Sequence, residues 1–254
     1  MRIGKQDQRA SAISTSTPDV ITVRGRDLCG ELIGKTDFTS YFWLLVTGEA
    51  PSETQRFFAD AVLTAIAEHG LVPSVVAARI TYAAAPEALQ GAVAAGLLGC
   101  GSVVLGSAEA AGRFLHGLVE SGEDAHGAVA RLRAEKQAIP GFGHPLHAGG
   151  DPRAEVLLRL AKEKGVEGPH IAALRAVEAA LPEALGRPLP VNVNGAIPAV
   201  MLDVGFPLAA LKGISLLART ASLIAHLNEE SERPIGFILS GEAAAAVDYD
   251  GPEG

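Results

Sequence analysis

Apolar residues recur along this chain with the period of an α-helix, and polar capping residues stand where the helices would begin. Phe58, Val62 and Ile66 repeat every four residues, which places their side chains on one face of a helix. Ser52 and Gln55 precede that pattern with the spacing of a capping box, in which each side chain binds the backbone N–H of the other residue. The pattern predicts a capped, amphipathic helix over this segment.

Three further segments combine a start signal with an apolar set. The start signals are Asp37, Asp151 with Pro152, and Pro207, and Gly48 marks a stop after the first set. The apolar sets that follow them are Phe38, Tyr41, Phe42 and Leu45; Val156, Leu157 and Leu160; and Leu211, Ile214, Leu217, Leu223 and Ile224. We expect a helix over each of these segments.

Strand signals are scarce, so the chain predicts an all-α fold with long loops. Residues 20–25 form the best strand candidate, and it is short. Residues 88–108 carry no charge and are long enough to span a membrane, but small residues dominate them and no basic residue marks an inner end. We interpret this stretch as a buried central helix region and not as a membrane span.

The composition limits the classes of protein that fit. The chain has 254 residues, 48% of them hydrophobic, which is enough for one large or two small domains. Its net charge of -8 argues against a nucleic-acid-binding surface. Cys29 and Cys100 lack further ligands at metal spacing, and residues 1–18 lack the apolar core of a secretory signal. We expect a cytoplasmic protein without a metal site, with neither nucleic acid nor membrane as a partner.

The most informative stretch covers residues 140–153, where four glycines interrupt any regular helix, so that a loop of about ten residues leads into the helix capped at Asp151. His144 is its natural general acid or base, because an imidazole titrates near neutral pH. Arg153 stands in the first turn of the following helix, where the helix dipole favours an acid, so a ligand carboxylate would explain it. An ordinary loop with a solvated arginine fits the same spacing, and the sequence leaves both readings open.

Polar side chains also interrupt apolar segments further along the chain. Asn192 and Asn194 lie within an apolar run, where they either cap the following helix or face a ligand. Arg219 lies inside an apolar helix with no acid three or four residues away, which favours an anion-binding role. Arg233 and His69 are weaker candidates, since a surface position or a helix end would explain each of them equally well.

At these stretches the sequence resembles citrate synthase and, more closely, the citryl-CoA lyase module of ATP-citrate lyase. The motifs that carry the resemblance are Gly141-Phe-Gly-His144 with Asp151-Pro-Arg153, for the family's G-x-G-H…D-P-R, and Asn192-Val-Asn-Gly195, for its N-V-D-G. Similar segments at residues 24–32, 38–51 and 218–234 extend the resemblance over nearly the whole chain.

The resemblance implies an architecture and a ligand. It implies an all-α, citrate synthase-like fold with a large helical domain, residues 1–104 and 206–254, and a smaller mobile helical domain, residues 105–205. It further implies a homodimer or higher homo-oligomer that holds a citrate-like carboxylate beside the thioester of coenzyme A, which is a substrate, and that uses no metal.

The resemblance also assigns roles to individual residues. The residues concerned are His144 and Asn194 in catalysis; His69, Arg153, Arg219 and Arg233 in binding the acid; and Gly141, Phe142 and Gly143 beside coenzyme A. His144 would hydrogen-bond the substrate oxygen that alternates between ketone and hydroxyl. The arginines would clamp carboxylates, because a guanidinium forms bidentate pairs with them, and Arg233 would come from the partner subunit.

Two positions depart from the family's pattern. Val104 stands where synthases have a histidine that helps to enolise acetyl-CoA, and because lyase modules also lack that histidine, the change favours cleavage over synthesis. Asn194 stands where the family has its catalytic aspartate. An amide cannot take or deliver the proton at the acetyl carbon, and losing a general base costs roughly two to four orders of magnitude in rate.

The sequence therefore leaves several hypotheses open. The first is a lyase that cleaves citryl-CoA, or a related acyl-CoA, to oxaloacetate and acetyl-CoA. The alternatives are a citrate synthase-type acyltransferase and a non-catalytic relative that binds citrate or coenzyme A. A plain helical scaffold fits least well, because it leaves Arg219 and the G-x-G-H…D-P-R motif without a reason.

Overall fold

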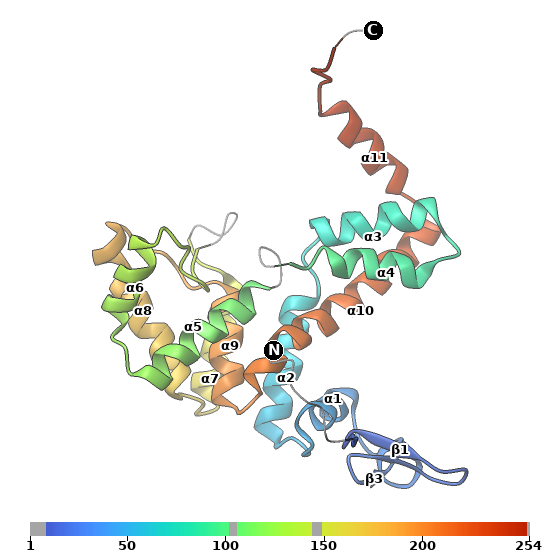
Figure 1. The fold of residues 1–254 in the computed structure, drawn as a ribbon, viewed down its shortest axis with the longest axis horizontal. Helices are drawn as coiled ribbons and strands as arrows, with labels where there is room; N and C mark the ends of the chain where they lie inside the picture. The colour runs from blue at the N-terminus through green and yellow to red at the C-terminus, as the bar shows by residue number, and fades with distance from the viewer. Residues whose placement is uncertain (1–8, 102–105, 144–148, 253–254) are drawn as a thin grey trace. The chain divides into compact units, whose positions relative to one another are not determined.

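The computed structural model describes residues 9–101, 106–143 and 149–252, and most of them lie in helices (Figure 1). This confirms the predicted helical class. The chain forms two compact units, one ending at Asp60 and the other covering Ala61–Gly254. The division into residues 105–205 and their flanking segments stays a prediction.

The first unit opens with a small antiparallel sheet in the order β1-β2-β3. Its strands are Ser14–Ser16, Ile21–Val23 and Arg26–Asp27, and a short π-helix, η1, follows at Leu28–Leu32. β2 lies within the stretch that the sequence marks as the best strand candidate, which confirms that prediction. β1 and β3 are not predicted, because their residues are polar and mostly exposed and so show no apolar alternation.

A tight turn joins β2 to β3. Arg24 and Gly25 in that turn have φ values of 50° and 79°, the left-handed conformations that a type I′ hairpin turn requires. The Arg24 guanidinium donates hydrogen bonds to the Leu45 carbonyl at 3.1 and 2.6 Å, which ties the hairpin to α1, Phe38–Thr47. The buried residues of this small core are Val23, Leu32 and Leu44.

Helices α1 and α2 begin as their capping residues predict. The Asp37 carboxylate accepts the Ser40 N–H at 2.8 Å at the start of α1, and Gly48 ends that helix with a φ of 87°. Ser52 and Gln55 exchange the two hydrogen bonds of the capping box, at 2.8 and 3.2 Å, before α2 at Glu53–Ala67. The apolar face predicted for α2 is buried.

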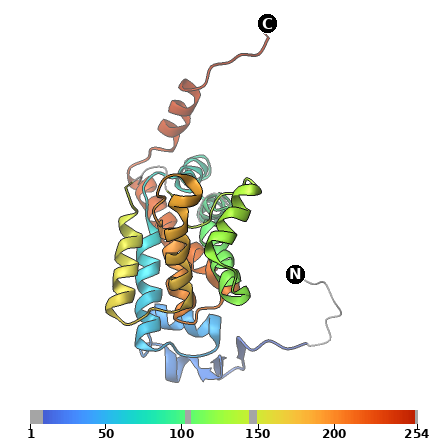
Figure 2. The same ribbon diagram turned by 90° about the vertical axis from the view of Figure 1, so that its left-hand side faces the viewer.

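In the second unit, α9 at Val193–Asp203 is the buried centre of a group of helices. It packs against α5, α7 and α8, while α6 packs against α8; Figure 2 shows this group from the side. The bounds of the four surrounding helices are Ser107–Ser121 (α5), Ala125–Ala134 (α6), Pro152–Glu163 (α7) and Pro169–Leu185 (α8). α9 suits the centre because apolar or small residues cover most of its circumference and are buried.

Further helices of the same unit pack around α10 (Figure 1). α3 and α4 pair with each other and contact α10, and α11 contacts α3. The bounds are Pro73–Ala84 (α3), Leu89–Leu98 (α4), Leu208–Ala210 (the 3-10 helix η2), Leu211–Glu232 (α10) and Gly236–Ala245 (α11). A Cβ on Gly96 would lie 2.7 Å from a methyl group of Leu223, so this glycine permits the close approach of α4 to α10.

Several details of the helix predictions are wrong. Val156 and Ile224 were expected in apolar stripes but are exposed. In α7 the buried stripe is Ala154, Leu157, Leu158 and Ala161, whose spacing follows the helical period more closely than the predicted set. Pro207 opens the short η2 and not α10 itself.

The uncharged stretch at residues 88–108 is not one buried helix. α4 ends at Leu98 and α5 begins at Ser107, with residues 102–105 outside the described part of the chain. Leu98 is 87% exposed, and α4 buries few of its residues completely. The sequence did not show where α4 ends or that one side of it is exposed, because no charged residue marks either feature in this stretch.

One helical run in the described chain, Leu208–Glu232, is long and apolar enough to cross a membrane by length and composition alone. Its residues Leu223 and Leu227 are buried against α3 and α4 within the unit.

Candidate functional site

Two of the motif stretches lie side by side although they are far apart in the sequence. The Gly143 N–H donates to the Pro190 carbonyl at 2.8 Å, and the Asn192 N–H donates to the Gly141 carbonyl at 3.0 Å. Between these bonds, Phe142 forms an isolated antiparallel bridge with the other stretch and is buried. We refer to residues 141–143, 151–153 and 190–195 as the α7–α9 corner.

Glycines at the α7–α9 corner let two backbone segments touch. Gly141 has a φ of 91°, and a Cβ on it would lie 2.8 Å from the Gly195 Cα. A Cβ on Gly195 would lie 2.5 Å from the Gly141 carbonyl oxygen. The sequence predicts that the loop glycines allow close approach to a ligand. At Gly141 the close approach in the structure is to Gly195 of the same chain.

Asp151 joins the beginnings of α7 and α9. Its carboxylate accepts the Arg153 N–H at 3.1 Å, which confirms its predicted capping role, and also the Val193 N–H at 2.9 Å. Burial by itself would raise the pKa of this carboxyl, but the hydrogen bonds from the Arg153 side chain and the Val193 N–H outweigh it and lower the pKa to about 2. Asp151 is therefore a fixed negative charge at this corner.

Arg153 has a partner that the sequence analysis did not assign to it. Its guanidinium binds the Asp151 carboxylate at 3.0 and 2.9 Å, and its side chain is 21% exposed. The pair explains an arginine in the first turn of α7 without a ligand. A ligand carboxylate at Arg153 would have to share the guanidinium with Asp151.

The two asparagines separate into different roles. Asn192 caps α9, since its side-chain oxygen accepts the N–H groups of Asn194 and Gly195 at 3.0 and 3.2 Å. Its side-chain nitrogen donates to the Gly143 carbonyl at 2.6 Å, so its amide is used within the chain. Asn194, in the first turn of α9, is half-buried and is the asparagine whose side chain does not serve as the cap.

Arg219 lies on a polar stripe along α10. We refer to Ser215, Arg219, Ser222 and His226, which recur at helical spacing, as the α10 polar face. Arg219 is 3% exposed, and its Nε and Nη1 have no hydrogen-bond partner among the residues that the structure describes. Burial lowers the pKa of Arg219, against the opposing effects of Glu68 and Cys100, yet a guanidinium stays protonated in proteins. A buried cation with unused donors is the arrangement that an anionic ligand would satisfy.

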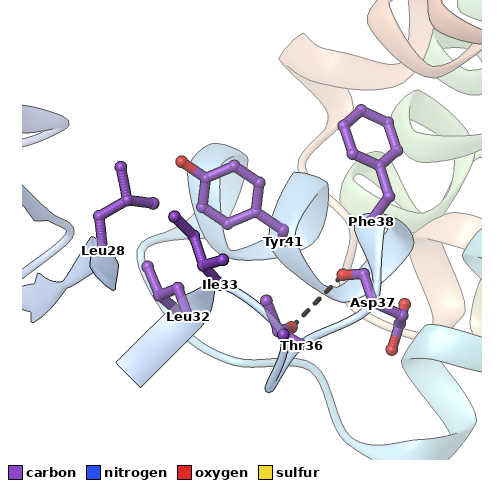
Figure 3. A pocket seen from close by; sticks show the side chains of 8 residues that line it. Leu28, Leu32, Ile33, Thr36, Asp37, Phe38 and Tyr41 are labelled. Carbon is purple, nitrogen blue, oxygen red and sulfur yellow. Dashed lines mark hydrogen bonds between the residues drawn. The ribbon is translucent and has the colours of Figure 1, made fainter. Parts of the chain in front are cut away.

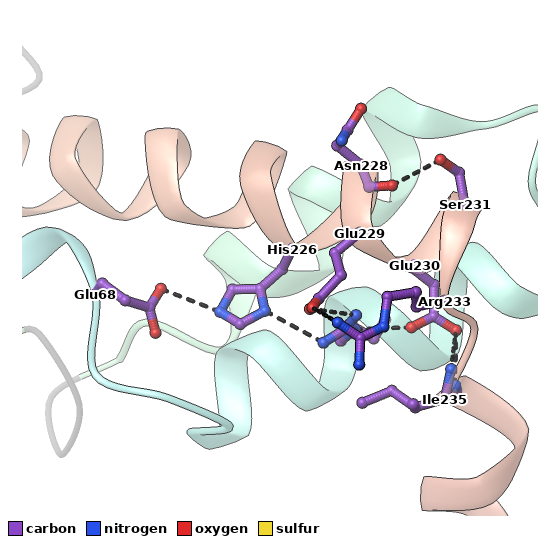
Figure 4. Close-up of polar contacts among 10 residues, drawn as sticks. Glu68, His226, Asn228, Glu229, Glu230, Ser231, Arg233 and Ile235 are labelled. Carbon is purple, nitrogen blue, oxygen red and sulfur yellow. Dashed lines mark hydrogen bonds and ion pairs between the residues drawn. The ribbon is translucent and has the colours of Figure 1, made fainter.

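A network of charged groups continues from the α10 polar face (Figure 4). The Glu68 carboxylate accepts hydrogen bonds from Ser222 Oγ and, at 3.0 Å, from His226 Nε2. The other ring nitrogen, His226 Nδ1, lies 3.4 Å from Arg79 Nη1. Arg79 is buried and pairs with Glu230 at 2.7 Å and with a second acid of α10 at 2.9 Å.

Sequence reasoning missed Glu68, Arg79 and His226. Arg79 could have been found by the argument used for Arg219, because it stands in an apolar helical stretch without an acid three or four residues away. Glu68 could have been found by the argument used for Arg153, because an acid at the C-terminal end of a helix opposes the helix dipole. His226 gave no signal, since a histidine on a polar face is ordinary.

The remaining predicted residues are less enclosed. His69 follows α2 in an exposed turn directly after Glu68. The Arg233 side chain is 82% exposed and lies 3.9 Å from Glu229 at the end of α10. His144 and Val104 lie outside the described residues.

An apolar pocket in the first unit holds none of the predicted site residues (Figure 3). Its lining side chains are Leu28, Leu32, Ile33, Thr36, Asp37, Phe38 and Tyr41. Apart from the exposed Arg233, the described candidates fall into two groups, the α7–α9 corner and the α10 polar face with the neighbouring Glu68–His69 turn.

Comparison with known sequences matches the chain to a family. The family described as citrate synthase, C-terminal domain, matches residues 31–236. A citrate synthase of Haloferax volcanii is 24% identical over 231 residues, which are 89% of this chain and 61% of that protein. A citrate synthase of Synechocystis is 33% identical over 133 residues, which are 51% of this chain and 32% of that protein. The chain thus spans less than two thirds of the length of these relatives.

Solved structures with the same fold include lyases. A citryl-CoA lyase from Hydrogenobacter thermophilus superposes with a TM-score of 0.88 and 30% identity, covering 100% of this chain and 96% of that one. An ATP citrate lyase from Methanothrix soehngenii, solved with citrate and coenzyme A, has a TM-score of 0.83 and 23% identity, covering 99% of this chain and 43% of that one. The citrate synthase-like fold is therefore confirmed. Because the family match covers most of the chain and the whole chain superposes on a citryl-CoA lyase, this protein belongs to the citrate synthase family.

Proposed function

We propose that this protein is a citryl-CoA lyase-type enzyme, which cleaves citryl-CoA or a related acyl-CoA to oxaloacetate and acetyl-CoA. The observation that carries the proposal is the buried Arg219 guanidinium, whose Nε and Nη1 have no hydrogen-bond partner in the part of the chain that the structure describes. A tricarboxylate supplies the anionic oxygens that such a cation needs, and a guanidinium binds a carboxylate with two parallel hydrogen bonds. The full-length likeness to a citryl-CoA lyase supports the choice of acid.

In this proposal the other predicted ligands bind the same acid as Arg219. Arg153 binds a second carboxylate while it keeps its contact with Asp151, and His69 adds a hydrogen bond. Arg233 is exposed on its own protomer, which suits the idea that it reaches the site of a partner subunit. Exposed apolar side chains such as Leu98, Phe237 and Ile238 support a homodimer or higher homo-oligomer, because association would cover them.

The cleavage requires one oxygen of the substrate to lose a proton and one carbon to gain a proton. The tertiary hydroxyl of the substrate loses its proton as the carbon–carbon bond breaks, and the electron pair of that bond goes to the acetyl carbon, which then takes up a proton. His144 is the residue we assign to the oxygen. Asn194 cannot supply the proton to carbon, so water, or a carboxyl group of the substrate in its protonated form, supplies it.

Coenzyme A is proposed to bind near Gly141, Phe142 and Gly143. Phe142 is buried and Gly141 touches Gly195, so these residues act by fixing the shape of the loop more than by side-chain contact. No metal is part of this proposal.

A second function is favoured by Asn194 alone. A relative that binds citrate or coenzyme A without turnover would keep the arginines and lose the proton donor, which is the combination present here. A synthase-type acyltransferase has less support, because enolisation of acetyl-CoA needs the general base that Asn194 cannot be.

The deciding experiment measures citryl-CoA cleavage through coupled detection of oxaloacetate, on the natural protein and on Asn194→Asp, with calorimetric titration of citrate alongside. Asn228→Asp, an exposed change on α10, is the control for added negative charge. Turnover by the natural protein supports the lyase. Citrate binding with turnover only by Asn194→Asp supports the binding relative. Neither binding nor turnover by either protein would refute the tricarboxylate site.

A further inference from the structure

The turn that carries His69 is held by the residue before it. The Glu68 Oε1 accepts the backbone N–H of His69 at 2.9 Å and that of Gly70 at 2.5 Å. Gly70 has a φ of 73°, so the chain reverses there in a conformation that glycine adopts readily. One carboxylate oxygen therefore fixes the backbone of this turn.

The other oxygen of the same carboxylate reaches α10. Ser222 Oγ and His226 Nε2 both donate to Glu68 Oε2. These two residues follow Arg219 by three and seven positions, so they lie on the same side of the helix as its guanidinium. Glu68 thus connects the turn of His69 to the α10 polar face.

The proton arrangement on His226 supports this connection. Arg79 Nη1 can only donate, so the Nδ1 that faces it at 3.4 Å must accept, and Nε2 then carries the hydrogen that Glu68 accepts. Arg79 itself is fixed by Glu230, whose side chain is 1% exposed, at 2.7 Å. A chain of polar contacts therefore leads from the buried core to Glu68.

We propose that Glu68 is a positioning residue of the tricarboxylate site, which holds His69 at a fixed place relative to Arg219. The inference rests on the proposed function, since it concerns the same ligand. Glu68 does not need to touch the ligand, because both of its oxygens are already used within the chain. A displacement of about 1 Å in a positioned group can cost on the order of 100-fold in rate, so an indirect role of this kind is measurable.

A purely structural role makes a different prediction. The Glu68 side chain is 52% exposed, and exposed ion pairs contribute little to the free energy of unfolding. If the contacts of Glu68 served stability alone, removing them would leave ligand binding unchanged and would lower the melting temperature only slightly.

The test compares Glu68→Ala with Glu68→Gln. Glutamine keeps an oxygen that can accept from His69 and Gly70, and its amide nitrogen can donate to Ser222 Oγ, which keeps one contact with α10. Alanine can make neither contact. Glu163→Ala is the matched control, because Glu163 also stands at the end of a helix and its side chain is 53% exposed. For each protein we would measure the citrate dissociation constant by calorimetry, and amide hydrogen exchange at residues 69–70 without ligand.

We expect Glu68→Ala to raise the citrate dissociation constant about tenfold. Amide exchange at residues 69–70 should become faster in the same variant, because the two N–H groups lose their acceptor. The citrate dissociation constant of Glu68→Gln should stay within about threefold of that of the natural protein. Glu163→Ala should have the same dissociation constant as the natural protein. If the lyase assay shows turnover, Glu68→Ala should raise KM far more than it lowers kcat.

The outcomes separate this inference from the proposed function. If the natural protein binds citrate and Glu68→Ala binds it equally well, or exchanges the amides of residues 69–70 no faster, the positioning role is wrong and the function stands. If Glu68→Gln is as impaired as Glu68→Ala, the acceptor geometry is not what matters and the inference is also wrong. If the natural protein binds no citrate, the proposed function fails and this inference fails with it.

Discussion

The α7–α9 corner and the α10 polar face each contain an arginine, and the two arginines differ in their hydrogen-bond partners. At the corner, Arg153 lies against Asp151, whose carboxylate also holds two backbone N–H groups. On α10, Arg219 is almost completely buried, yet two of its nitrogens have no partner among the described residues. Within the described residues, the charges of the first region pair with each other, whereas two donors of the cation in the second region find no partner.

The difference indicates which of the two arginines is the better candidate for binding a ligand. An arginine with an internal partner contributes to the structure whether or not a ligand binds. A buried arginine without one is a cost to folding that only an external anion offsets. The sequence assigns both residues to the same task, and the structure makes Arg219 the stronger anchor.

The largest effect is expected for Arg219→Met. Removal of the unused donors should weaken citrate binding about 100-fold, since truncating a charge that pairs with a ligand costs roughly 2–5 kcal/mol. The free energy of unfolding should stay equal or rise by about 1 kcal/mol, because an unpaired buried charge disappears. Calorimetry and denaturant unfolding measure the two quantities. Arg175→Met, at an exposed ion pair on α8, is the control. A loss of stability without a loss of binding would overturn the comparison.

Gly195→Ala should show how tightly the α7–α9 corner is packed. The new Cβ would lie 2.5 Å from the Gly141 carbonyl oxygen, so one backbone must move. We expect the free energy of unfolding to fall by about 2–3 kcal/mol, as overpacked sites do. Gly213→Ala in α10 meets nothing within 4 Å and should be neutral or stabilising by about 1 kcal/mol. Equal unfolding curves for the two variants would contradict the close contact.

Asp151→Asn tests the fixed charge at the corner through its pH dependence. The folded-state pKa of Asp151 is lowered from 3.8 to about 2, so its stabilising effect is complete above the unfolded value and is lost as the pH falls through about 2. Asparagine can still cap α7, so the variant should lose about 2 kcal/mol of unfolding free energy at pH 7 and converge with the natural protein near pH 2. A difference that does not shrink with acid would show that the charge is not responsible.

The smallest effect is expected for Arg153→Met. Its pair with Asp151 is partly exposed, so the free energy of unfolding should fall by about 1 kcal/mol. Citrate binding should weaken about tenfold, less than for Arg219→Met, because Asp151 already shares the guanidinium. The same calorimetric titration checks it. A larger loss of affinity here than at Arg219 would reverse the ranking of the two arginines.

The helix boundaries illustrate what a sequence pattern can predict. The cap at Asp37, the capping box at Ser52 and Gln55, and the cap at Asp151 all appear where the pattern places them. Each depends on hydrogen bonds between residues two or three positions apart, so the local sequence contains both partners. The apolar stripe of α7 was predicted less well, because which face is buried depends on helices elsewhere in the chain.

The candidate site divides in the same way. Its residue types and the need of Arg219 for an anion are visible in the sequence, because a charge in an apolar helix has few explanations. The roles of Asn192 and Asn194 were left as alternatives, and the structure separates them by the contact of Asn192 with Gly143. Glu68 was missed altogether, since the residues that donate to its Oε2 lie more than 150 positions away.

By itself, the sequence determined the helical class, the capped starts of several helices and the presence of an arginine in an apolar helix with no acid three or four residues away. Only the tertiary structure decided that Asp151, besides capping α7, accepts the N–H of Val193. It also decided that Gly141 and Gly195 touch and that Glu68 connects a turn to α10. The physical reason is range. Caps and stripes arise from neighbours within one or two helical turns, whereas the partner of a distant polar group depends on how the helices pack.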